Sequence, residues 1–171
     1  DDLAWVVDRF ADAAERCVRA GYDGLELHAG HGYLLDQFLS PRNARTDGWG
    51  GDLDGRARLL LTVIGAIRAR VGATFPLWMR INAREYHREV GEVFEEQCAV
   101  IDKAQAAGID AVHVTAYANT DVATSATDSY APHVVGDLPG FAAEVRRRTG
   151  LPVITYGRYE PEEAERILAE G

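Results

Sequence analysis

Two histidines and a tyrosine, His28, His31 and Tyr33, fall within six residues of this sequence. A short apolar run precedes them, so they are expected where a strand of a parallel sheet ends, and ligands bind beyond the carboxyl ends of such strands. Imidazole N–H groups can hold a substrate carbonyl or anionic oxygen, and a tyrosine can donate a proton to a strong base that forms beside it. The three residues therefore predict a catalytic site that reduces a polarised C=C bond. In it His28 and His31 bind the substrate and Tyr33 is the proton donor.

Two other interpretations of His28 and His31 stay open at this point. Backbone groups could satisfy both rings in a helix or loop. Their H-x-x-H spacing could also ligate a metal ion, with Glu26 or Asp36 as a third ligand. That spacing is a weak signal, and no H-E-x-x-H pattern accompanies it. We therefore predict no metal site.

Three further residues could hold a cofactor. Arg80 lies near the end of an expected strand, where a buried arginine needs an anionic or strongly accepting partner. That partner could be a flavin ring, or Glu26 in a salt bridge. Gly157 and Arg158 follow another expected strand, and glycine with arginine can cradle a phosphate there. A turn with an exposed arginine would look the same in sequence.

Alternating elements position these residues. Apolar residues at helical spacing predict a helix over residues 3–17, ended by Gly21, and the next apolar run predicts a strand over 23–28. The same reasoning predicts helices over residues 57–71, 91–107 and 141–148, a last helix from residue 160, and strands over 77–82, 111–115 and 153–156. Long polar loops are expected over residues 42–56 and 116–137.

Strands that alternate with helices predict an α/β fold with right-handed connections and a parallel sheet. The chain has 171 residues and four expected strands, whereas a closed (β/α)₈ TIM barrel takes about 250 residues. We therefore expect residues 1–171 to form a single domain that is part of such a barrel.

Composition excludes several classes of protein. A formal net charge of -9 argues against nucleic-acid binding. No apolar run approaches the roughly 20 residues of a membrane span, and the first residues do not resemble a signal peptide. Cys17 and Cys98 show no disulfide or metal spacing. The expected compartment is the cytoplasm, and the expected partner is a small molecule.

The stretch HAGHGYLLDQFLSPRNARTDGWGG, residues 28–51, closely resembles the Old Yellow Enzyme and 2,4-dienoyl-CoA reductase family of NADH:flavin oxidoreductases. The likeness continues through Arg56 and Arg58, and more loosely through RIN at 80–82, VHVT at 112–115 and PVITYGR at 152–158. It thus covers nearly the whole chain.

The resemblance implies an FMN-binding (β/α)₈ barrel, here its strands 4 to 7, with NADH or NADPH as the reductant. His28 and His31 would hold the activating oxygen of an alkene substrate, and Tyr33 would protonate it. Arg80 would contact the flavin ring, and Gly157 with Arg158 its phosphate end. Missing strands would leave the 171 residues inactive by themselves. A further domain with FAD and a 4Fe–4S cluster could occur outside them, as in the dienoyl-CoA reductase branch.

Departures and alternatives stay open. Gly55 replaces the asparagine common before Arg56, and we expect this to affect only a loop. A catalytically silent half-barrel could associate through its open sheet edges, with a second copy or with the rest of a barrel. A sugar-phosphate aldolase or isomerase could use Arg158. Lys103, the only lysine, falls in an expected helix, which disfavours a Schiff-base mechanism.

Overall fold

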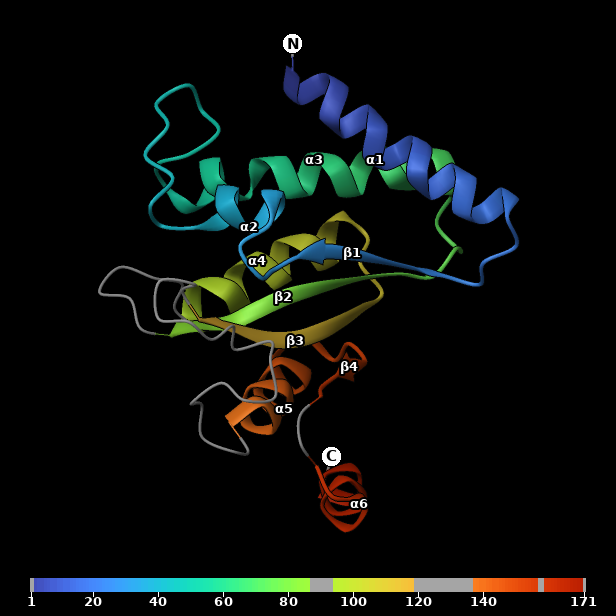
Figure 1. Cartoon of the computed structure of the whole chain (residues 1–171), viewed down its shortest axis with the longest axis vertical. Coiled ribbons are helices and arrows are strands. Elements are labelled where there is room, and N and C mark those ends of the chain that lie inside the picture. The colour runs from blue at the N-terminus through green and yellow to red at the C-terminus, as the bar shows by residue number, and fades with distance from the viewer. Residues whose placement is uncertain (1, 87–93, 119–136, 157–158, 171) are drawn as a thin grey trace.

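A computed structural model describes residues 2–86, 94–118, 137–156 and 159–170 (Figure 1). Helices and strands alternate along most of it, as the sequence predicts. Their bounds are α1 Asp2–Arg19, β1 Leu25–Ala29, α2 Leu34–Leu39, α3 Leu53–Val71, β2 Leu77–Tyr86, α4 Phe94–Ala107, β3 Ala111–Ala118, α5 Asp137–Thr149, β4 Val153–Ile154 and α6 Pro161–Glu170.

The four strands form one sheet in the order β1-β2-β3-β4, and every neighbouring pair is parallel. Consecutive strands therefore lie side by side, and each connection passes through at least one helix. The register places His28 beside Arg80, and Arg80 beside His113. Polar residues predicted at strand ends are thus brought to neighbouring positions.

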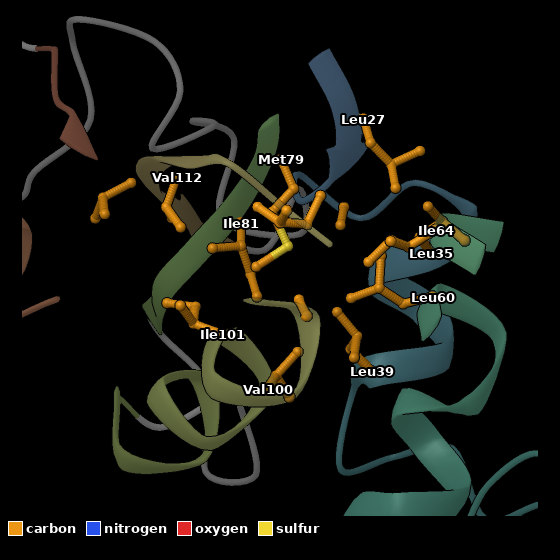
Figure 2. Close-up of a cluster of buried hydrophobic side chains, with 14 of the residues drawn as sticks. Leu27, Leu35, Leu39, Leu60, Ile64, Met79, Ile81, Val100, Ile101 and Val112 are labelled. Carbon is orange, nitrogen blue, oxygen red and sulfur yellow. The ribbon is translucent and has the colours of Figure 1, made fainter. Parts of the chain in front are cut away.

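The two faces of the sheet differ sharply. Leu27, Met79 and Val112 are buried toward helices α2, α3 and α4, together with Leu60 of α3 and Ile101 of α4 (Figure 2). Because side chains alternate along a strand, the residues between these apolar ones point to the opposite face. That opposite face, called the polar face below, carries the candidate site.

The polar face is built from the alternate residues of three strands. These are Glu26 and His28 on β1, Trp78, Arg80 and Asn82 on β2, and His113 and Thr115 on β3.

Helix α1 packs on α3, on the side of the sheet opposite the polar face (Figure 1). No described helix is long and apolar enough to cross a lipid bilayer. Cys17 and Cys98 are both free thiols.

Several element bounds differ from the predicted ones. Helix α3 begins at Leu53 rather than residue 57, because the Asp52 side chain caps it by accepting a 2.8 Å hydrogen bond from the Gly55 N–H. Strands β2 and β3 run on to Tyr86 and Ala118, since they pair with each other beyond the predicted ends. Strand β4 has only two residues, both paired with β3.

Gly55 therefore lies in the first turn of α3, and the expectation of a purely loop effect is wrong. A Cβ at Gly55 would come within 2.2 Å of the Gly50 carbonyl oxygen. The cap of α3 and the end of the preceding loop are packed so closely that only glycine fits without a backbone shift.

We expect Gly55→Ala to lower the free energy of unfolding by about 1–3 kcal/mol, because the new methyl group overpacks this contact. Gly65→Ala is the matched control in the same helix. Nothing lies within 4 Å of its added Cβ, so this variant should stabilise the chain by about 0.5–1 kcal/mol. Urea denaturation of the two variants measures both effects, and equal changes would contradict the assignment.

Candidate active site

The predicted cluster of His28, His31 and Tyr33 comes together at the carboxyl end of β1. His28 is in the strand, His31 is in the turn that follows, and Tyr33 occupies the N-cap of α2. The His28 ring centroid lies 4.9 Å from that of His31 and 5.1 Å from that of Tyr33. The geometry groups the three rings, and their catalytic roles remain predictions.

A buried clamp holds the turn that carries His31. His31 is a non-glycine residue in the left-handed region, at φ 60°, which is a strained conformation. The His31 N–H donates to Asn82 Oδ1 at 3.2 Å, and the Gly32 N–H donates to Asp36 Oδ2 at 2.7 Å. Asn82 Nδ2 in turn donates to Asp36 Oδ1 at 2.9 Å. Both acceptor side chains are buried, so the turn is fixed from the protein interior.

Glu26 organises the rest of the polar face. Its Oε2 accepts hydrogen bonds from Trp78 Nε1 and His113 Nδ1, each at 2.8 Å, and its Oε1 lies 2.7 Å from Arg80 Nη2. Burial alone would raise the pKa of this carboxyl group, but the hydrogen bonds from His113 and Trp78 outweigh it and the pKa is lowered. Glu26 is therefore an anion that joins three strands.

Arg80 forms the salt bridge with Glu26 that the sequence left open as an alternative to a flavin contact. This ion pair does not use the whole guanidinium group. Arg80 Nε is buried and has no hydrogen-bond partner among the described residues. A buried donor without an acceptor is costly, so this nitrogen is available to a bound acceptor.

The two histidines of the cluster are held neutral. Burial and the nearby Arg80 cation lower the pKa of His28. Burial, together with repulsion from His28 and Arg80, lowers the pKa of His31 from 6.5 to about 4. At neutral pH each ring is therefore an uncharged imidazole with one N–H donor.

Residues that sequence reasoning did not single out complete the surroundings of His31. Its Nε2 lies 2.7 Å from Thr115 Oγ1, which lies 2.7 Å from the Tyr156 hydroxyl. Alternation along VHVT could have placed Thr115 on the polar face. Neither residue type signals a site by itself, because threonine and tyrosine are common in strands.

The structure also bears on the interpretations of the sequence that involve a metal ion, Lys103 and a phosphate group. Glu26 and Asp36, the proposed third metal ligands, are engaged by the donors described above, and no group of three or more His, Cys, Asp or Glu within the described ranges could hold a metal ion. Lys103 of α4 pairs with Asp54 of α3 at 2.7 Å, and neither residue is in a strand. Gly157 and Arg158 lie outside the described residues.

Comparison with known proteins gives consistent results. The sequence model of the NADH:flavin oxidoreductase / NADH oxidase family matches residues 1–171. An NADH oxidase of Thermoanaerobacter brockii is 37% identical over 173 residues, which cover 100% of this chain and 26% of that protein. An NADPH dehydrogenase of Geobacillus thermodenitrificans is 34% identical over 172 residues, which cover 99% and 48%.

A solved structure is also similar. The chain aligns with 2-naphthoyl-CoA reductase in its complex with 2-naphthoyl-CoA at a TM-score of 0.86 and 30% identity, over 99% of this chain and 26% of that one. The predicted family resemblance and the predicted partial (β/α)₈ barrel are thereby confirmed. The chain spans between 26% and 48% of the lengths of these three proteins.

We expect the His31 ring to stay neutral down to a pH of about 4. Its pKa in the folded chain lies below the unfolded value, so the unfolded chain binds more protons between pH 6.5 and about 4. The contribution of His31 to stability is therefore lost as the pH falls through that window. Histidine ring NMR signals followed against pH give the pKa directly, with His31→Asn to assign the signal. A midpoint near 6.5 would contradict the burial described here.

Proposed function

Because the chain belongs to the NADH:flavin oxidoreductase / NADH oxidase family, we propose that it carries the substrate-binding side of an FMN-dependent ene-reductase. The substrate would be a small molecule with a C=C bond conjugated to a carbonyl group, and NADH or NADPH would be the reductant. One observation supports this proposal most strongly. Three rings able to bind and protonate such a substrate gather next to an arginine with a free buried donor.

The residues present fit a flavin. The Arg80 guanidinium has five N–H donors, and its unpartnered buried Nε can donate to the electron-rich edge of the ring system. Glu26 Oε1 lies 2.7 Å from Nη2 of the guanidinium, so Arg80 is oriented before any ligand binds. When bound, FMN would supply hydride transfer between the nicotinamide and the alkene. Gly157 and Arg158 are proposed to hold its phosphate end.

His28 and His31 are proposed to bind the carbonyl oxygen of the substrate. As the C=C bond is reduced, negative charge develops on this oxygen, and N–H donors fixed in place stabilise that charge. The neutral state of both rings at pH 7 gives each one a donor without a formal charge. His28 Nδ1 is buried and has no partner among the described residues, so this ring is not fully committed to the protein.

Tyr33 is proposed to protonate the α-carbon. Its ring packs 5.1 Å from His28, yet its side chain is 63% exposed, so a substrate can reach the hydroxyl group from the open side. The position at the N-cap of α2 fixes the backbone of Tyr33 directly after the clamped turn. Substrate oxygen and proton donor are thereby presented from one short segment.

In a flavin-loaded protein that includes the rest of the barrel, we expect Tyr33→Phe to slow the reduction of 2-cyclohexenone about 100-fold or more, as for loss of a general acid. The rate at which NADH or NADPH reduces the protein should stay unchanged, because that half-reaction does not need the proton. Stopped-flow absorbance separates the two rates. Tyr22→Phe is the matched control, since Tyr22 is 65% exposed and follows α1. Equal rates for Tyr33→Phe and the parent protein would refute the assignment.

A further inference from the structure

Three side chains from different parts of the chain form one hydrogen-bonded row. Thr115 Oγ1 of β3 lies 2.7 Å from His31 Nε2 and 2.7 Å from the hydroxyl group of Tyr156, which follows β4. Thr115 has no exposed surface, so water does not compete for its hydroxyl group. The row ends on a residue of the candidate site.

Counting protons leaves two possible directions for these hydrogen bonds, from Tyr156 toward His31 or from His31 toward Tyr156. The Thr115 hydroxyl group has one proton and touches two neighbours at short distance. The Ala116 carbonyl oxygen, at 3.5 Å, is too far to be its main acceptor. Either hydroxyl group could donate in the hydrogen bond between Tyr156 and Thr115, and we assign the phenol as the donor because a phenol is a stronger hydrogen-bond donor than an aliphatic hydroxyl group. With the phenol as donor, Thr115 gives its own proton to His31 Nε2.

An imidazole nitrogen that accepts a hydrogen bond carries no proton. In a neutral histidine the proton then resides on the other ring nitrogen, because the bond made by one nitrogen sets the state of the other. We propose that Thr115 and Tyr156 are positioning residues that hold His31 as its Nδ1–H tautomer, so that Nδ1 is the donor offered to the substrate oxygen. The substrate part of this inference rests on the function proposed above.

Two features of the structure support the proposal. The lowered pKa of His31, caused first by burial, keeps the ring neutral, and only a neutral ring has a choice of tautomer. The ring centroids of Tyr156 and His113 lie 5.4 Å apart in a T-shaped arrangement, and His113 is hydrogen-bonded to Glu26. This ring contact places the Tyr156 phenol against the polar face.

The tautomer can be observed without flavin or substrate. Through-bond ¹H–¹⁵N spectra of the ¹⁵N-histidine-labelled 171-residue chain at pH 7 distinguish a protonated from an unprotonated ring nitrogen. We expect His31 to show a protonated Nδ1 and an unprotonated Nε2. A protonated Nε2 in the parent chain would overturn the proposal.

Variants test the role of each hydroxyl group. Thr115→Val should move the proton of His31 from Nδ1 to Nε2, and Thr115→Ser should restore the parent state. Tyr156→Phe should give a mixture, because Thr115 is then free to accept as well as donate. Tyr159→Phe is the matched control, since its hydroxyl group contacts Thr155 and the Tyr156 carbonyl oxygen instead.

An unchanged His31 spectrum in Thr115→Val would show that Thr115 does not set the tautomer. An unchanged spectrum in Tyr156→Phe alone would remove Tyr156 from the role. Failure of the proposed oxidoreductase activity would leave these spectra as they are, so the two proposals fail separately.

Discussion

The Glu26 carboxylate is the interaction on which the polar face of the sheet depends. It lies on β1 and accepts from donors on both β2 and β3. Among the described residues, Glu26 is the carboxylate that pairs with the Arg80 cation, which lies beside His28 and His113 in the sheet. Although burial opposes it, the hydrogen bonds from His113 and Trp78, with a smaller contribution from the Arg80 charge, keep the pKa of Glu26 below its usual value, so the group is an anion at neutral pH. Arg80 is thus held in place, and its remaining N–H donors are available to a ligand.

The clamp of Asn82 and Asp36 adds a second constraint. It satisfies two backbone N–H groups of a turn in which His31 has a left-handed conformation. Buried polar groups that are fully paired rigidify their surroundings. The imidazole of His31 therefore starts from a fixed backbone and is held at its ring by Thr115. Preorganisation of this kind lets donors meet developing charge without rearrangement of the protein.

Much of this could be predicted from sequence, because the informative residues are close together in the chain. The order of helices and strands follows from local periodicity, and His28, His31 and Tyr33 fall within six residues at the junction of β1 and α2. The salt bridge of Arg80 with Glu26 was also within reach, since both residues fall on neighbouring strands. The sequence places the start of α3 too late, because the capping residue Asp52 lies within a glycine-rich stretch.

The partners of His31 were out of reach for a physical reason. Thr115 is 84 residues away and Asn82 is 51 residues away, so these contacts depend on strand register and not on local pattern. Asparagine, threonine and tyrosine in such positions carry no signal of their own. Register fixes the face that each residue occupies, and only the assembled sheet shows which of them meet.

The account depends most on the claim that His28, His31 and Arg80 serve one ligand-binding region. A crystal structure of the flavin-loaded protein with a bound phenolate, whose oxygen mimics that of an enolate, tests it most directly. We expect the phenolate oxygen within hydrogen-bonding distance of both histidines, and Arg80 Nε donating to the flavin ring. A phenolate bound elsewhere, or an Arg80 Nε still without an acceptor, would contradict the account.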